Sequence, residues 1–155
     1  MKHTVRKATL EDMPVLLEFK KGLIAAELPM DPTIKKDTTT YYDLAGLIQA
    51  EDSEIFVVEM EGEIVATGYA KILEDREYLV HDRFGYLGFM FVPEKYRGNG
   101  YNQLVLNALL DWCKSRNIFE IKLDVYDNNP PAIRAYEKAG FKKYLVNMRL
   151  NLKDL

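Results

Sequence analysis

The sequence predicts a mixed α+β domain, and three observations predict it. Two runs rich in β-forming residues, 55–59 and 64–69, flank the dipeptide Glu61-Gly62, which is typical of a tight hairpin turn. A third such run, 86–92, leads through a loop that contains two glycines into a helical pattern at 101–115. The length of 155 residues fits one domain, so we expect a single domain over residues 1–155.

The N-terminal third is expected to form a short strand and two helices. Residues 5–8 predict the strand. Thr9 and Asp12 have the spacing of a capping box, in which a threonine and an acid three residues later satisfy free backbone N–H groups. Apolar residues at mostly helical spacing then predict a helix over about 13–27, which two following prolines end. A second helix is predicted over residues 40–50.

The C-terminal half alternates helices and strands. A charged loop is expected over 73–82, before the third strand. After the helix at 101–115, residues 118–126 predict a strand and residues 131–139 a helix that begins with proline and stops at a glycine. A last strand is predicted over 141–152. The predicted order is therefore β-α-α-β-β-β-α-β-α-β.

Composition narrows the class of protein. Hydrophobic residues make up 48% and charged residues 29%, which is ordinary for a soluble globular protein. No apolar run is long enough for a signal peptide or a membrane span, and a lone cysteine, Cys113, fits a reducing compartment, so a cytoplasmic protein with no membrane partner is expected. With His3 and His81 as the only histidines, no metal site is expected. The net charge of −3 does not favour nucleic-acid binding.

The loop Arg97-Gly98-Asn99-Gly100 carries the clearest chemical signal. Glycines let a ligand approach the backbone, and the helix that follows offers unpaired N–H groups and the positive end of its dipole. Such a loop suits a pyrophosphate, with Arg97 to neutralise charge. A plain surface turn is the competing interpretation of a lone Gly-x-Gly. A dinucleotide-binding loop fits poorly, because its third glycine would fall at Gln103.

Two motifs resemble the GNAT superfamily of acyl-CoA N-acyltransferases. Residues 92–110 resemble its cofactor-binding segment, with Arg97 and Gly100 at signature positions and Asn102 as a departure at the last small position. Residues 129–141, Asn-Pro-Pro-Ala-Ile-Arg-Ala-Tyr-Glu-Lys-Ala-Gly-Phe, resemble a second family segment closely. Two motifs in the right order are more specific than either alone.

The resemblance implies a GNAT fold and a site for acetyl-CoA. In that fold a central mixed, mostly antiparallel sheet is flanked by helices, and two parallel strands, here 86–92 and 119–126, splay apart to hold acetyl-CoA. A backbone N–H near Met90 would hold the oxyanion of the intermediate. The expected cofactor-binding residues are Met90, Phe91, Val92, Arg97, Gly98, Asn99, Gly100, Tyr101, Asn102 and Asn129.

The resemblance also implies a general acid but leaves the base open. Tyr136 would protonate the departing CoA thiolate, since a phenol with a pKa near 10 is protonated at neutral pH; a core aromatic is the competing interpretation. Asn129 matches a family asparagine that helps to position the cofactor arm, and a turn asparagine is its alternative. The strand at 86–92 lacks the carboxylate that many relatives use as base. Glu27, Asp82, Asp124 and a water relay are the candidates.

The function expected from these features is transfer of an acetyl group from acetyl-CoA to a primary amine of a small molecule, polyamine or peptide. The alternatives are a catalytically silent CoA-binding sensor or assembly module, and a nucleotide-binding protein. Acidic segments on the expected acceptor side would attract a cationic amine. Their acids are Glu27, Asp31, Glu74, Asp75, Glu77 and Asp82. The last strand, 144–152 in particular, would be a natural edge for a homodimer, by analogy with relatives.

Overall fold

The computed structural model describes residues 2–35 and 41–155. The chain divides into two compact units, residues up to Asp124 and residues 125–155, and each is described by itself. No helix in the described ranges is both long and apolar enough to cross a bilayer.

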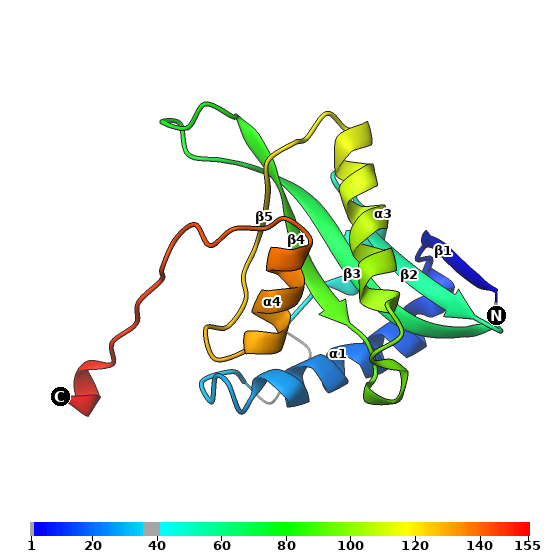
Figure 1. Ribbon diagram of the computed structural model, residues 1–155, viewed down its shortest axis with the longest axis horizontal. Coiled ribbons are helices and arrows are strands. Elements are labelled where there is room, and N and C mark those ends of the chain that lie inside the picture. The colour runs from blue at the N-terminus through cyan, green and yellow to red at the C-terminus, as the bar shows by residue number, and fades with distance from the viewer. Residues whose placement is uncertain (1, 36–40) are drawn as a thin grey trace. The chain divides into compact units, whose positions relative to one another are not determined.

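The first unit contains one five-stranded sheet and three helices (Figure 1). Its strands are β1 (His3–Lys7), β2 (Ser53–Met60), β3 (Glu63–Glu74), β4 (Arg83–Phe91) and β5 (Ile121–Leu123). Its helices are α1 (Met13–Glu27), α2 (Leu44–Gln49) and α3 (Tyr101–Ser115), with short 3₁₀ turns η1 (Leu10–Asp12) and η3 (Glu94–Tyr96). The second unit contains helix α4 (Pro130–Lys138) and a 3₁₀ turn η4 (Leu152–Asp154).

The sheet has the strand order β1-β2-β3-β4-β5. The first three pairings are antiparallel and the pairing of β4 with β5 is parallel. The predicted hairpin joins β2 to β3, and both residues of its turn, Glu61 and Gly62, have positive φ, 50° and 83°. The mixed, mostly antiparallel sheet flanked by helices is confirmed.

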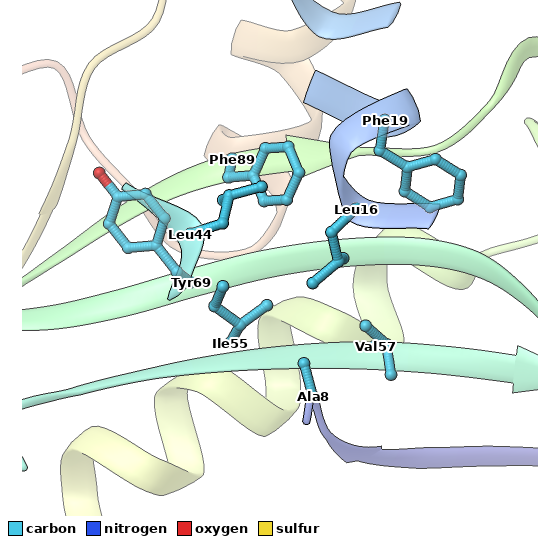
Figure 2. Packing of buried hydrophobic residues seen from close by; sticks show 8 residues of the cluster. All are labelled: Ala8, Leu16, Phe19, Leu44, Ile55, Val57, Tyr69 and Phe89. Atoms are coloured by element: carbon cyan, nitrogen blue, oxygen red, sulfur yellow. The ribbon is translucent and has the colours of Figure 1, made fainter. Parts of the chain in front are cut away.

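Helices α1 and α2 cover one face of the sheet. Figure 2 shows the cluster that they bury with strands β2, β3 and β4, and the Tyr69 hydroxyl points away from its aliphatic members. The members of the cluster are Ala8, Leu16, Phe19, Leu44, Ile55, Val57, Tyr69 and Phe89. Because these residues come from three strands, two helices and, at Ala8, the segment after β1, the α1 and α2 side of the sheet is a continuous apolar core.

Helix α3 lies on the opposite face (Figure 1). Gly68, the neighbour of Tyr69 in β3, faces it so closely that a Cβ there would come within 2.8 Å of a Val105 methyl carbon. Successive side chains of a strand point to opposite faces, so Tyr69 and Gly68 mark the two faces of the sheet. Cys113 also packs here, fully buried, and burial raises the pKa of its thiol to about 11. A packed, unreactive thiol is what that environment produces.

The predicted capping box is present between β1 and α1. The Asp12 carboxylate accepts the backbone N–H of Thr9 at 2.8 Å and two hydrogen bonds from the Arg6 guanidinium, at 2.8 and 2.9 Å. The hydrogen bonds from Arg6 hold the pKa of Asp12 below its ordinary value. The cap thus ties the start of the helical segment to strand β1.

Several predicted bounds in the first unit differ from the structure. Helix α2 begins at Leu44, four residues later than expected, and residue 40 lies outside the described residues. Strand β3 runs to Glu74 because it stays paired with β4, so the loop begins at Asp75. Strand β5 covers 121–123 alone, since it is a strand only where β4 pairs with it.

Residues of the second motif, 129–141, determine where helix α4 of the second unit begins and ends. The Asn129 side chain accepts the backbone N–H of Ala132 and caps the start of α4. At the other end the backbone N–H groups of Gly140 and Phe141 bond to the carbonyls of Glu137 and Tyr136, both at 3.0 Å. These bonds, with Gly140 at φ 109°, form a Schellman motif.

The strand predicted over 141–152 is wrong. Residues 141–151 have no regular secondary structure, and η4 follows them. The alternation of apolar and polar residues in this segment is a strand pattern, but a strand also needs a neighbour to hydrogen-bond with, and the sheet of the described residues ends at β5. Val146, Met148 and Leu150 are consequently exposed.

Candidate active site

Strands β4 and β5 part halfway along β4. Their register pairs Gly85 with Ile121, Tyr86 with Lys122 and Leu87 with Leu123, and it ends there. Strand β4 continues to Phe91, still paired with β3, whereas β5 stops. The carboxyl half of β4 therefore borders an opening in the sheet of the described residues rather than a strand, as the splayed pair predicts.

A β-bulge lies at this opening. Tyr69 of β3 pairs with Gly88 and Thr67 pairs with Phe91, so two residues of β4 oppose one of β3. Phe89, the first of the two, has φ 54°, an unusual conformation for a residue with a side chain. A Cβ on Gly88 would fall 2.5 Å from the Tyr69 ring, so no larger residue fits without movement. Bulges of this kind turn backbone groups out of the ladder and are enriched beside active sites.

The side chains of Met90 and Phe91 are used in packing, which leaves their backbone as the chemically available part. The Met90 sulfur lies on the α3 face near Gly68, and the Phe91 ring lies against Gly22 and 5.4 Å from the Phe19 ring on the α1 face. The Val92 carbonyl accepts the Arg97 Nε–H at 2.9 Å. That bond uses one of the two acceptor positions of the Val92 carbonyl. The backbone groups of Met90, Phe91 and Val92 remain the expected contacts with a ligand.

The loop after β4 has the conformation that its sequence predicts. Gly98 and Gly100 have φ 82° and 80°, and a Cβ added at either would meet no atom within 4 Å. The Asn99 amide donates to the Tyr96 carbonyl at 2.9 Å, and Tyr96 hydrogen-bonds through its hydroxyl to Glu63 of β3. These hydrogen bonds hold the loop in place, while the space beside its glycine backbone stays open.

Helix α3 begins directly after this loop, at Tyr101, with Gly100 as its N-cap. The backbone N–H of Leu104 bonds back to the Gly100 carbonyl, so the N–H groups of Tyr101, Asn102 and Gln103 have no partner within the helix. Free N–H groups at the positive end of a helix suit an anion, and the exposed Arg97 lies three residues before the N-cap. The loop and the opening beside β4 are consecutive along the chain.

Tyr136 and Asn129 lie in the second unit, where both have structural contacts. The Tyr136 ring meets Phe141 edge to face with centroids 5.7 Å apart, which is the apolar contact of the Schellman motif. Burial raises the pKa of Tyr136, so its hydroxyl is protonated at neutral pH. Asn129 is the helix cap described above, which satisfies the turn interpretation of this residue.

A row of four tyrosines in the first unit was not predicted from the sequence. Tyr41 stacks on Tyr42 at 4.5 Å, the Tyr42 ring meets Tyr69 at 5.6 Å, and Tyr69 lies 6.4 Å from Tyr86. We call Tyr41, Tyr42, Tyr69 and Tyr86 the tyrosine row. Burial is the main cause that raises the pKa values of Tyr42, Tyr69 and Tyr86. Tyr69 and Tyr86 face the same side of adjacent strands, a relation that appears only once strand register is known.

Two of the three candidate bases close the ends of this row. Glu27, the last residue of α1, accepts the Tyr41 hydroxyl at 2.6 Å. Asp124, the residue after β5, accepts the Tyr86 hydroxyl at 2.9 Å. The third candidate, Asp82, lies in the loop before β4, at the end where β4 and β5 stay paired.

The acidic loop expected on the acceptor side lies at the start of β4. Residues 75–82 join the end of β3 to the start of β4, whereas the opening borders the end of β4. Asp75 is also neutralised, since its carboxylate bonds to the Lys122 ammonium at 2.6 Å and to His81 at 2.5 Å. The hydrogen bond from Lys122 is the main cause that lowers the pKa of Asp75. This loop therefore lies away from the opening beside β4, and its place on the acceptor side stays a prediction.

No metal site emerges from the described part of the chain. Within residues 2–35 and 41–155, no three His, Cys, Asp or Glu side chains gather in a way that could hold a metal ion.

Comparison with known proteins places the chain in a family. A family model described as "Acetyltransferase (GNAT) family" matches residues 23–141. The N-alpha-acetyltransferase of Sulfurisphaera tokodaii is 26% identical over 151 residues, 93% of this chain and 83% of that protein. The glucosamine 6-phosphate N-acetyltransferase of Arabidopsis thaliana is 29% identical over 101 residues, 63% of this chain and 64% of that protein.

A solved structure agrees with the family match. A predicted acetyltransferase from Clostridium acetobutylicum, solved with acetyl-CoA, superposes with a TM-score of 0.77 at 25% identity, over 99% of both chains. The family model itself covers more than half of this sequence. The chain therefore belongs to the acetyltransferase (GNAT) family and is an acetyl-CoA-dependent acyltransferase.

Proposed function

We propose that the chain transfers the acetyl group of acetyl-CoA directly to a primary amine, through a tetrahedral intermediate. The observation that carries this proposal is the parting of β4 from β5 after Leu87, beside a bulge at Phe89 and directly before the Gly98–Gly100 loop. The β4 edge that β5 leaves unpaired, the bulge and the glycine loop before α3 follow one another along a single stretch of chain. That order suits an elongated thioester with a pyrophosphate at one end.

The loop residues would bind the pyrophosphate. First-turn N–H groups of α3, from Tyr101 and Asn102, would donate to its oxygens, and Arg97 would neutralise charge. Gly98, Asn99 and Gly100 would let the phosphates approach the backbone, since the space above both glycines is open. Backbone groups of Met90, Phe91 and Val92 would pair with the pantetheine arm, as an added strand pairs with a sheet edge.

The chemistry then needs three groups. The amine lone pair attacks the acetyl carbon and forms the C–N bond, while a backbone N–H near Met90 stabilises the oxyanion. The C–S bond breaks, and the Tyr136 hydroxyl gives its proton to the departing thiolate. The amine must also lose one proton, which requires a base. Asn129, beyond its role as a helix cap, is proposed to help to position the cofactor arm.

The acceptor is proposed to be a primary amine of a small molecule or of a peptide. Two relatives carry names that state different acceptors, an α-amino group and glucosamine 6-phosphate, and both acceptors present a primary amine. We further propose that residues 1–155 act as one catalytic domain. The family match, residues 23–141, crosses the boundary between the two units and supports this proposal.

The direct test is release of free CoA thiol from acetyl-CoA in the presence of a panel of amines. The panel should contain peptides with free N-termini, amino sugars, polyamines and lysine. We expect release that depends on one class of amine, with a mass gain of one acetyl group on the product. Binding of acetyl-CoA with no thiol release in any arm would instead identify a silent CoA-binding module.

A matched pair of glycine variants tests the binding site. Gly100→Ala and Gly62→Ala both place a side chain at φ near +80° in open space, so both should lose about 1–2 kcal/mol of stability. Only Gly100 belongs to the proposed pyrophosphate site. We expect the Gly100→Ala variant to lose acetyl-CoA affinity by roughly 10-fold or more, since the added Cβ takes the space through which the phosphates would approach the backbone, while the Gly62→Ala variant binds like wild type. Equal acetyl-CoA affinities of the two variants, measured by calorimetry, would show that the loop does not bind the cofactor.

A further inference from the structure

The structure points to a base for the proposed reaction among the carboxylates that the sequence left open. We infer that Asp124 is the catalytic base that takes the proton of the acceptor amine, and that Tyr86 is the positioning residue that holds its carboxylate at the opening. This inference rests on the proposed acetyl transfer.

The position of Asp124 is the first argument. The last paired positions of β4 and β5 are Leu87 and Leu123, so Gly88 and Asp124 are the first positions beyond the ladder, one on each strand. Asp124 therefore lies where the strands begin to part. Its side chain is exposed, so an acceptor can reach it. Phe89, where the backbone leaves the ladder, is the next residue after Gly88.

The contact with Tyr86 is the second argument. The Tyr86 hydroxyl donates to the Asp124 carboxylate at 2.9 Å, which fixes one oxygen and leaves the other free to accept a proton. Tyr86 packs against the cluster on the α1 and α2 face of the sheet. Helix α3, whose first turn carries the anion site, lies on the opposite face. The carboxylate is thus held toward the face away from α3, where an acceptor would not compete with the pyrophosphate site.

The tyrosine row gives this site its electrostatic character. Burial, and then the negative charge of Asp124, raise the pKa of Tyr86, so Tyr86 stays protonated and remains a hydrogen-bond donor. The same two causes act on Tyr69. Among the described residues, the charged groups in contact with the row are Asp124 at one end, Glu27 at the other, and the buried Lys20, whose ammonium donates to the Tyr42 carbonyl at 3.3 Å. Asp124 is the carboxylate that lies beside the opening.

The two other candidates are less well placed. Glu27 lies at the far end of the row, behind Tyr41 and Tyr42. Asp82 lies before β4, at the end where the strands stay paired. At roughly 3.3 Å per residue, the five residues from Arg83 to Leu87 alone separate Asp82 from the opening by more than about 13 Å. Neither reaches an amine at the opening without a relay.

The proton balance is complete with Asp124. As the C–N bond forms, the nitrogen becomes positively charged and strongly acidic, and one N–H proton passes to the Asp124 carboxylate. The C–S bond then breaks, the amide remains neutral, and the thiolate receives a proton from the Tyr136 hydroxyl. Solvent returns the phenol and the carboxyl to their starting states, so no further reactant is needed.

The test compares Asp124→Asn with Asp82→Asn in the full chain. Asparagine keeps the shape of aspartate and can still accept the Tyr86 hydroxyl, so the fold should survive while the basicity is lost. With the amine found active for wild type, we expect kcat of the Asp124→Asn variant to fall by roughly 100-fold or more. Its KM for acetyl-CoA should stay near the wild-type value, and the Asp82→Asn variant should behave like wild type.

Two further readouts separate a base from a structural residue. The fall of kcat at acid pH should disappear in the Asp124→Asn variant, and the deficit should shrink with a weakly basic acceptor such as methoxyamine, whose nitrogen loses its proton more readily. The kcat of the Tyr86→Phe variant should lie between that of wild type and that of Asp124→Asn, because the Asp124 carboxylate remains but loses the hydrogen bond that holds it. A wild-type kcat and acid limb in Asp124→Asn, or an equal loss in Asp82→Asn, would overturn the inference. Acetyl-CoA binding with no turnover of any amine by wild type would instead sink the proposed function and the inference together.

Discussion

Tyr136 has two separable parts, a ring that packs on Phe141 and a hydroxyl that the proposed chemistry uses. Tyr136→Phe keeps the ring contact of the Schellman motif and removes only the proton donor. We expect unchanged thermal stability, unchanged acetyl-CoA affinity and a kcat lower by roughly 100-fold, in line with the usual contribution of general acid catalysis. Steady-state kinetics with calorimetry measures all three. A loss of kcat that shrinks with a thioester donor whose thiolate is a better leaving group would support the role, and an unchanged kcat would reject it.

Asp12 is a residue whose charge matters to the fold rather than to the site. Its pKa is held low by Arg6, so it contributes stability above the ordinary aspartate pKa of about 3.9, and that contribution is lost as pH falls through the lower, folded-state pKa. We expect the unfolding midpoint to drop in acid partly for this reason. Asp12→Asn should be less stable than wild type at neutral pH and should approach wild type at low pH. Parallel midpoint curves across pH would contradict this.

Among the elements, those whose partners are local were predictable from the sequence. The hairpin, the loop with Gly98 and Gly100, and helix α3 over 101–115 depend on turn chemistry and helical periodicity, which short stretches of sequence carry. The bulge at Phe89 and the tyrosine row were not predictable, because both depend on the register between strands that are far apart in sequence. Asp124 was among the candidate bases in the sequence, but the choice between it and the others depends on the same strand register.

In the segment that follows α4, the sequence pattern predicts a strand that the structure does not contain. Val146 and Met148 are 83% and 87% exposed although the alternation places them on one apolar face. The homodimer expected from this segment stays a prediction. Met148→Lys should then shift a dimer toward the monomer, whereas Asn147→Lys, on the alternate face, should not. Light scattering after size exclusion measures the mass of each variant, and a monomeric wild type would contradict the dimer.

At the scale of the whole molecule, three separate observations concern one ligand. The family match, the parting of β4 from β5 and the open glycine loop all concern acetyl-CoA, although they come from sequence comparison, strand register and backbone conformation. Acetyl-CoA bound at the bulge and the loop would stabilise the folded chain, because a ligand that binds only the folded state shifts the unfolding equilibrium. Of the acceptor, by contrast, only the primary amine is proposed.

Thermal unfolding with and without acetyl-CoA is the most direct test of the central claim, with NAD and ATP as controls. At roughly 100 times its dissociation constant a ligand adds about 2.7 kcal/mol of stability. For a chain of this length, that should raise the unfolding midpoint by roughly 5–10 °C. We expect such a rise with acetyl-CoA and CoA alone. No rise at saturating acetyl-CoA, or an equal rise with NAD or ATP, would contradict it.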